Sequence, residues 1–254
     1  MQFFKYQGTG NDFILIDNRA LNFQGNVAQL CDRRFGIGAD GLMLLQNKAG
    51  YDFEMVYYNS DGNISSMCGN GGRCIVAFAK HLGIIDIDTR FIAIDGEHEA
   101  RVHPDGRVSL GMNPVMDIAR DQEAFVLDTG SPHYVKQVSD IKEIDLVGDA
   151  QEVRYNEPYK QDGINVNFIE LKDKGLKIRT YERGVEDETL SCGTGVTAAA
   201  ISHHQILNEG DGSFVKEVEA VGGDLQVKFN YAGSVGYTDI QLIGPAEFVF
   251  EGEI

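Results

Sequence analysis

Two short segments of the chain share one four-residue pattern, in which a cysteine is followed by glycine, a variable residue and glycine. They are Cys68-Gly69-Asn70-Gly71 and Cys192-Gly193-Thr194-Gly195. A thiol can take up or release a proton not far from neutral pH, and only the thiolate is strongly basic and nucleophilic. Flanking glycines let the backbone approach a ligand closely. The pattern therefore marks both cysteines as candidate acid/base groups.

Each pattern precedes an apolar stretch that predicts a helix, over residues 72–82 and 196–207. The first N–H groups of a helix have no partner within it and lie at the positive end of its dipole. Thiolates and carboxylates are both stabilised at such a position. We therefore expect each cysteine to lie at a helix N-terminus, where the following N–H groups can hold a carboxylate.

The chain around the two patterns is also repeated, which indicates an internal duplication. Thr9-Gly10-Asn11 corresponds to Thr129-Gly130-Ser131, and Pro114 corresponds to Pro245. The offset rises steadily from 120 to 131 residues, as small insertions would make it. Duplication predicts two similar domains, and one large α/β domain is the alternative.

The repeat places the boundary near residue 113. We predict a first domain of residues 1–112 plus 244–254, which carries Cys68, and a second domain of residues 113–243, which carries Cys192. The last strand, over residues 247–251, then returns to the first domain. Further apolar segments bounded by turn residues predict strands over 13–16, 53–58, 90–94, 165–171 and 176–181.

These elements predict the fold class α+β (α/β). We expect two pseudo-symmetric domains, each a mixed sheet wrapped around a central helix, with the active site in the cleft between the domains. Two thiols and two helix N-termini around one carboxylate suit inversion at a carbon atom. One cysteine, as thiolate, would remove the α-proton of an amino acid, and the other, as thiol, would protonate the opposite face.

Composition limits the partners. The chain has 254 residues and a formal net charge of −17, so nucleic acid and membrane surfaces are not expected to bind it. A signal peptide and an apolar run of about 18 residues are not found, which favours a cytoplasmic protein with a small-molecule partner. The four cysteines include no C-x-x-C pair, and Gly36–Gly41 precedes a strand pattern, which argues against a dinucleotide loop. We predict no metal and no cofactor.

Five longer motifs are spread over the whole chain. They are Gly8-Thr9-Gly10-Asn11-Asp12-Phe13, Asn59-Ser60-Asp61-Gly62, Met67-Cys68-Gly69-Asn70-Gly71-Gly72-Arg73-Cys74, Tyr181-Glu182-Arg183-Gly184 and Cys192-Gly193-Thr194-Gly195. In these motifs, their order and their spacing, the chain resembles the diaminopimelate epimerase family. The resemblance implies a cofactor-independent isomerase that interconverts LL- and meso-diaminopimelate by a two-base mechanism, in lysine and cell-wall precursor biosynthesis. It also implies a homodimer, for which Phe248 and Phe250 are candidate interface residues.

The matching positions imply roles for individual residues. Cys68 and Cys192 would be the acid/base pair, and His133 and Glu182 would help to set their protonation. Ser131 replaces a common asparagine and Gly41 replaces a glutamine found in some members, so both are further candidate contacts. The implied substrate-binding residues are Asn11, Asn59, Gly69, Asn70, Asn165, Glu182, Arg183, Gly193 and Thr194.

Two other functions stay open. A proline or hydroxyproline racemase would share the scaffold, but it usually has histidine after the first Cys-Gly, where this chain has Asn70. A non-catalytic amino-acid-binding relative would keep the helix N-termini and not need the thiols. Among the remaining residues, Cys31 and Cys74 are predicted to be core, with Cys31 on a helical stripe that extends to Phe35. The acidic segment 186–188 is predicted to be a solvated loop or an acidic lid that favours ammonium groups.

Overall fold

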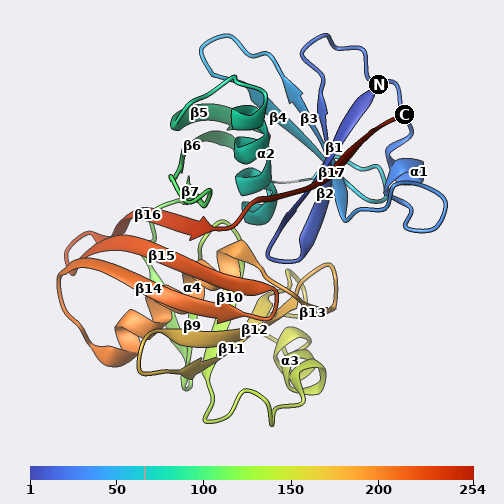
Figure 1. The fold of residues 1–254 in the computed structure, drawn as a ribbon. Helices are drawn as coiled ribbons and strands as arrows, with labels where there is room; N and C mark the ends of the chain where they lie inside the picture. Colours follow the sequence, from blue (N-terminus) through green and yellow to red (C-terminus); the bar gives the residue numbers. More distant parts are fainter. Residues whose placement is uncertain (66) are drawn as a thin grey trace. The chain divides into compact units, whose positions relative to one another are not determined.

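The computed structural model describes residues 1–65 and 67–254 of the chain (Figure 1). The chain divides into two compact units. Unit 1 comprises Met1–Leu110 together with Gly244–Ile254, and unit 2 comprises Gly111–Ile243. The chain therefore leaves unit 1 once and returns to it for its last strand.

The strands of unit 1 pair in the order β17-β1-β2-β3-β4-β5-β6-β7. Two of these pairings, β2 with β3 and β4 with β5, are parallel, and the others are antiparallel. The C-terminal strand β17, dark red in Figure 1, lies beside the blue N-terminal strand β1. The bounds are β1 Gln2–Gly8, β2 Asn11–Asp17, β3 Gly41–Gln46, β4 Glu54–Asn59, β5 Asp88–Ala93, β6 Gly96–Val102, β7 Val108–Gly111 and β17 Glu247–Glu253.

The strands of unit 2 follow the same plan, in the order β8-β9-β10-β11-β12-β14-β15-β16. Again two pairings are parallel, β10 with β11 and β12 with β14, at the same places in the order. The short strand β13 is an addition that pairs with β12. The bounds are β8 Ile118–Asp121, β9 Ala124–Asp128, β10 Pro132–Gln137, β11 Asn165–Leu171, β12 Leu176–Glu182, β13 Asp187–Thr189, β14 Gly212–Ala220, β15 Gly223–Ala232 and β16 Gly236–Gly244.

Each sheet surrounds one long helix. Helix α2 (Gly69–His81) contacts β1, β2, β3 and β6 of unit 1, and α4 (Gly193–Leu207) contacts strands from β9 to β15 of unit 2. Small apolar residues allow α4 to be covered on all sides, since Ala198, Ala199, Ala200 and Ile201 are each fully buried. The prediction of two similar domains with mixed sheets around a central helix is confirmed.

Two shorter helices complete the units. Helix α3 (Leu146–Arg154) packs against β11 and β12, and no sequence pattern singled it out. Helix α1 (Val27–Cys31) is shorter than predicted, because the Asp32 carboxylate accepts the N–H groups of Arg34 and Phe35 and turns the chain. The prediction that an apolar helical stripe extends to Phe35 is therefore wrong, since the helix ends at Cys31 and Phe35 is 85% exposed.

The other predicted core positions agree with the structure. Cys31 and Cys74 are buried, and burial raises the pKa of the Cys31 thiol to about 11 and that of Cys74 to about 12. Both helices after the cysteine patterns begin three residues earlier than predicted, directly after the cysteine. Within the described part of the chain, no helix combines the length and the apolar character needed to cross a membrane.

Candidate active site

Cys68 and Cys192 are the N-cap residues of α2 and α4. Their backbones are alike, with φ/ψ of −109°/128° at Cys68 and −107°/112° at Cys192, and neither side chain caps its own helix. Neither helix has an acidic residue in its first turn. Neither helix therefore supplies a carboxylate of its own first turn at its positive end, where an anion is stabilised.

The second glycine of each pattern is closely packed. A Cβ atom on Gly71 would lie 2.2 Å from the Cε of Met43, and one on Gly195 would lie 2.6 Å from the Oδ1 of Asn167. Both distances are below van der Waals contact. The flexible end of Met43 can move aside for a larger residue at position 71, whereas the amide of Asn167 is held by hydrogen bonds to Tyr134 and Thr180. The second glycine is therefore required for close packing at Gly195.

In unit 1, the side chain of Asn11 faces the sulfur of Cys68. The thiol donates to Asn11 Oδ1 at 3.6 Å, and Asn70 Nδ2 donates to the same oxygen at 3.5 Å. The amino group of Asn11 donates in the other direction, to Asp40 Oδ2 at 2.6 Å. Because a carboxylate can only accept, Asp40 directs the amide oxygen of Asn11 towards Cys68.

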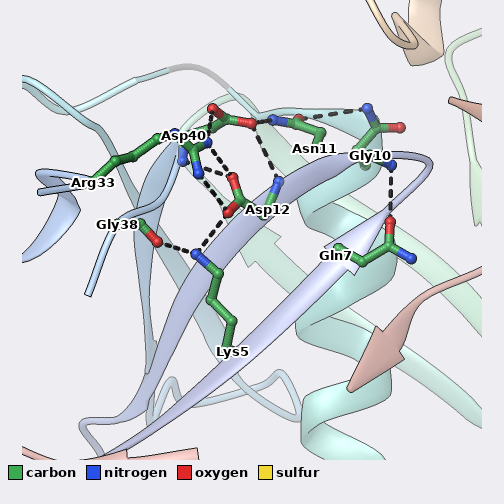
Figure 2. A network of polar contacts seen from close by, with 9 residues as sticks. Lys5, Gln7, Gly10, Asn11, Asp12, Arg33, Gly38 and Asp40 are labelled. Carbon is green, nitrogen blue, oxygen red and sulfur yellow. Dashed lines mark hydrogen bonds and ion pairs between the residues drawn. The ribbon is translucent and has the colours of Figure 1, made fainter. Parts of the chain in front are cut away.

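Asp40 belongs to a charged network that Figure 2 shows from close by. Arg33 bridges Asp40 and Asp12 with N–O distances of 2.7 Å, and the buried ammonium group of Lys5 contacts Asp12 at 2.7 Å (Figure 2). Burial opposes ionisation of Asp12, but hydrogen bonds from Arg33 and Lys5 outweigh it and hold the pKa of this carboxyl well below its usual range. Asn11 is therefore anchored to a network of paired charges.

Arg73 lies on the first turns of α2 and is fully buried. Its guanidinium group donates to Thr9 Oγ1 at 3.2 Å and to Asn70 Oδ1 at 3.0 Å, and its charge interacts with the Cys68 thiol. Burial lowers the pKa of Arg73 from its high ordinary value. A buried cation behind the helix start favours the ionised form of the nearby sulfur.

Gly41 and Asn59 face each other across the β3–β4 pair. Asn59 is exposed, whereas Gly41 is buried against Tyr57, whose ring would lie 2.5 Å from a Cβ atom at position 41. A glutamine cannot be accommodated there without moving Tyr57. Only the backbone of Gly41 can take part in binding.

In unit 2, the carboxyl group of Glu182 hydrogen-bonds to the thiol of Cys192. Its Oε2 also accepts the hydroxyl of Thr189 at 3.0 Å. Burial raises the pKa of Glu182, and the two hydrogen bonds only partly offset this effect. A buried carboxylate in contact with a thiol can accept the proton of that thiol.

A second set of neighbours of Cys192 consists of neutral groups joined by hydrogen bonds. Thr194 Oγ1 lies 3.4 Å from the sulfur, and His133 Nε2 lies 2.9 Å from the same hydroxyl oxygen. The second ring nitrogen of His133 is 3.1 Å from Asn167 Nδ2. Burial, with a smaller contribution from the charge of Arg183, lowers the pKa of His133 to about 3. His133 is therefore a neutral imidazole.

Three further predicted residues meet at the ends of β10, β11 and β12. Asn165 Nδ2 donates to Ser131 Oγ at 2.8 Å, and Asn165 Oδ1 accepts the backbone N–H of Arg183 at 2.9 Å. The guanidinium group of Arg183 is exposed and donates to the carbonyl of Asp162. Serine at 131 thus keeps one bond to Asn165 and leaves the arginine head group accessible.

Comparison with known proteins decides the family. The family model described as diaminopimelate epimerase matches residues 3–116 and 125–249. This chain belongs to the diaminopimelate epimerase family. A relative named diaminopimelate epimerase from Flavobacterium psychrophilum is 51% identical over the full length of both chains. Another, from Chlorobaculum tepidum, is 42% identical and covers 97% of this chain and 98% of its own.

Solved structures with the same fold are much more distant in sequence. The PhzF-family phenazine biosynthesis protein of Bacillus anthracis matches all of this chain and 98% of its own, with a TM-score of 0.76 at 14% identity. A probable proline racemase from Agrobacterium radiobacter matches all of this chain and 92% of its own, with a TM-score of 0.70 at 14% identity. These likenesses concern the fold alone.

The residues that family resemblance singled out are only partly brought to the cysteine of their unit, since Asn59 and Gly41, and likewise Asn165, Ser131 and Arg183, are paired with one another. Unit 1 brings Asn11 and Asn70 to Cys68, and unit 2 brings Glu182, Thr194 and His133 to Cys192. Among residues 1–65 and 67–254, no group of three or more His, Cys, Asp or Glu side chains is arranged to hold a metal ion. Asp40, Arg73 and Asn167 were not predicted as site residues. For Asn167 a signal was present, because the strand alternation that places Asn165 on one face of β11 also places Asn167 there.

The acidic segment is not a free lid. Glu186 Oε1 accepts a hydrogen bond from the guanidinium group of Arg154 at 3.1 Å, and Glu186 Oε2 accepts hydrogen bonds from the hydroxyl groups of Tyr155 and Tyr181. Glu188 forms two hydrogen bonds to Arg179, at 2.7 and 2.8 Å. Since both carboxylates are paired inside unit 2, the expectation of an acidic lid that attracts ammonium groups is wrong for these two residues.

Proposed function

We propose that this chain interconverts LL- and meso-diaminopimelate without a cofactor, with Cys68 and Cys192 as the two acid/base groups. Membership of the diaminopimelate epimerase family supports the substrate. The observation that carries the mechanism is the repeated helix start, which gives each cysteine the same backbone geometry and an uncapped positive helix end. Such a pair suits removal of a proton from one face of a carbon and its replacement on the other.

In the proposed reaction one sulfur, as thiolate, takes the α-proton, and the electron pair of the C–H bond moves into the adjoining carboxylate. The N–H groups of Gly69, Asn70, Gly193 and Thr194 stabilise the charge that develops there. The other sulfur, as thiol, gives its proton to the opposite face. Each turnover therefore ends with the protonation states of the two sulfurs exchanged.

The proposed roles of the remaining residues follow their positions. Glu182 accepts and returns the proton of Cys192. Arg183 binds the distal carboxylate, because its exposed planar fork can bind two oxygens at once. Asn11, Asn59, Asn165 and Ser131 contact the amino groups and the distal end, and Gly41 contributes backbone only.

Solvent exchange tests the proposed reaction. LL-diaminopimelate incubated with the pure protein in D₂O should gain deuterium at one α-carbon. Binding without deuterium incorporation would overturn catalysis and favour the amino-acid-binding alternative. Incorporation into proline or hydroxyproline, and none into diaminopimelate, would favour the racemase alternative instead.

We further propose a homodimer that forms through β17. This strand pairs with β1 on one side, and its residues Phe248, Val249 and Phe250 are each 43–52% exposed on a strand edge. An exposed apolar edge strand is a natural pairing surface for a second copy. Val249→Lys should shift the protein to monomer in sedimentation experiments, and an unchanged mass would overturn this interface. Val249 is chosen because Phe248 and Phe250 also pack on Tyr6 and Phe3 within the unit.

The mechanism needs reduced thiols, so we propose that the protein works in the cytoplasm. Alkylation in intact cells before lysis should recover Cys68 and Cys192 as thiols. Recovery of either as a disulfide would contradict this location.

A further inference from the structure

A series of hydrogen bonds leads from Asn167 through His133 and Thr194 to Cys192. The orientation of the Asn167 amide determines which group donates in each of them. Asn167 is fully buried on β11, and its Nδ2 lies 3.0 Å from the backbone carbonyl of Tyr134. A carbonyl oxygen only accepts, so the group facing it must be the amino group. The amide oxygen then faces Thr180, whose hydroxyl donates to it at 2.9 Å. The orientation of this amide is therefore fixed at both ends.

The same amino group also faces His133. Asn167 Nδ2 lies 3.1 Å from His133 Nδ1, so this ring nitrogen is the acceptor and carries no proton. A neutral imidazole must then carry its proton on Nε2, which points at Thr194 Oγ1 at 2.9 Å. Thr194 Oγ1 accepts a hydrogen bond from this N–H group, which leaves the hydroxyl hydrogen of Thr194 to be donated to Cys192 Sγ at 3.4 Å.

We propose that Asn167 is a positioning residue that holds His133 as a neutral donor on Nε2, so that Thr194 donates its hydroxyl to the sulfur of Cys192. His133 then serves Cys192 as a hydrogen-bond donor and takes no proton from it. Glu182, whose carboxyl group also interacts with the thiol of Cys192, remains the proposed acceptor of its proton. The inference rests on the proposed function only in taking Cys192 as one of the two bases.

The surroundings of His133 agree with this role. The ring is fully buried, and a Cβ atom on Gly195 would lie 3.4 Å from its Cε1. The charged groups near these hydrogen bonds are Arg183, which acts on His133, and Glu182, which acts on Cys192. A positive charge beside the ring disfavours a second proton, in line with a pKa of about 3 for His133.

The first test uses the unaltered protein. Nitrogen-15 NMR of histidine-labelled protein should show His133 with a protonated Nε2 and an unprotonated Nδ1, unchanged between pH 5 and pH 8. The signal is assigned by its loss in His133→Gln. A proton on Nδ1, or on both nitrogens, at neutral pH would overturn the proposal.

The second test follows the sulfur. In Asn167→Ala, His133 loses the partner that fixes its protonation, and the rate of Cys192 alkylation by iodoacetamide at pH 7 should fall about fivefold, as expected for one lost hydrogen bond to the thiolate. Peptide mapping reports Cys68 in the same sample as the control, and its rate should not change. A faster reaction at Cys192, as simple loosening would give, or equal changes at both cysteines, would overturn the proposal.

The third test asks whether Asn167 acts through Thr194. Thr194→Val should slow Cys192 alkylation to the same degree, Thr194→Ser should restore it, and Asn167→Ala should have no further effect in the Thr194→Val background. Additive effects would overturn the relay. Because alkylation and NMR do not depend on turnover, failure of this inference is distinct from failure of the D₂O exchange that tests the epimerase function.

Discussion

The two cysteines lie in equivalent backbone frames but have different side-chain surroundings. Around Cys68 the neighbouring groups are charged or tied to charges, namely the buried Arg73 and the Asp40 network that holds Asn11. Around Cys192 one carboxyl group, Glu182, faces a chain of neutral hydrogen-bonding groups. The position equivalent to Arg73 is Thr197, whose hydroxyl donates to the carbonyl of Gly193 at 3.0 Å.

This difference shows how two duplicated helix starts can give their cysteines different electrostatic surroundings. A cation near Cys68 favours its thiolate, whereas a carboxylate near Cys192 favours its thiol. A two-base reaction needs one sulfur in each form at the same moment. A cation therefore acts on one sulfur and a carboxyl group on the other, although the two helix starts have the same backbone geometry.

Removal of either thiol is expected to have the largest effect on the epimerisation rate, and it tests whether both cysteines are necessary. Cys68→Ala and Cys192→Ala should each lower the rate of diaminopimelate epimerisation at least about 10³-fold, because each removes an acid/base group. Chiral chromatography of the product mixture measures the rate. Full activity in either variant would show that one cysteine is sufficient, which contradicts the two-base mechanism.

The charged network on the Cys68 side should also stabilise unit 1. Asp12→Asn leaves the buried Lys5 without its carboxylate and should lower the free energy of unfolding by about 3 kcal/mol at pH 7. The pKa of Asp12 is depressed in the folded state, so this contribution is present above the ordinary aspartate range and is lost as the pH falls below about 4.

Urea unfolding should therefore show a difference in the free energy of unfolding between wild type and Asp12→Asn that is smaller at pH 3 than at pH 7. Asp17→Asn is the matched control. Asp17 is on the same strand as Asp12, but the side chains of Asp17 and its partner Arg19 are 32% and 40% exposed, so this pair should contribute less than about 1 kcal/mol. Equal losses in the two variants would show that the buried network has no special role.

On the Cys192 side, the carboxyl group of Glu182 should matter through proton transfer. Glu182→Gln should lower turnover about 10²-fold. Since burial raises the pKa of Glu182, the acid limb of the wild-type pH profile should lie above the ordinary glutamate range and be absent from the variant. Glu188→Gln, which alters only the pair with Arg179, is the control, and a similar loss there would contradict the assignment.

The smallest effect is expected from the residue that orients Asn11. Asp40→Ala frees the Asn11 amide to turn and should lower kcat/KM about fivefold, the effect of one hydrogen bond. Mapped alkylation rates should change at Cys68 and stay constant at Cys192. A change at Cys192 and none at Cys68 would mean that the surroundings of the two cysteines are not independent.

Much of this arrangement could be predicted from residue types and order. The repeated Cys-Gly-x-Gly pattern correctly predicted two similar units, and the apolar stretches after it correctly predicted α2 and α4. Helix starts were placed too late, because glycine has a low helix propensity, and the packing of Gly71 and Gly195 against the sheet overrides it.

Side-chain partners were much harder to predict. Lys5, Asp12, Arg33 and Asp40 come from separate parts of unit 1 and meet only through the pairing of β1, β2 and β3. The segment 186–188 appeared to be an uncompensated charge run because Arg154 and Arg179 lie on other elements. Sequence patterns report local periodicity, whereas these contacts depend on strand order and register.

The return of β17 to unit 1 also affects the order in which the chain can fold during synthesis. Unit 2 is one continuous segment, so all of it has been synthesised before the last strand of unit 1. Until then β1 can pair with β2 but has an open edge where β17 will lie. The second unit in the sequence is therefore the first that can be completed, and the nascent chain carries an exposed strand edge, open to wrong pairing, for most of its translation.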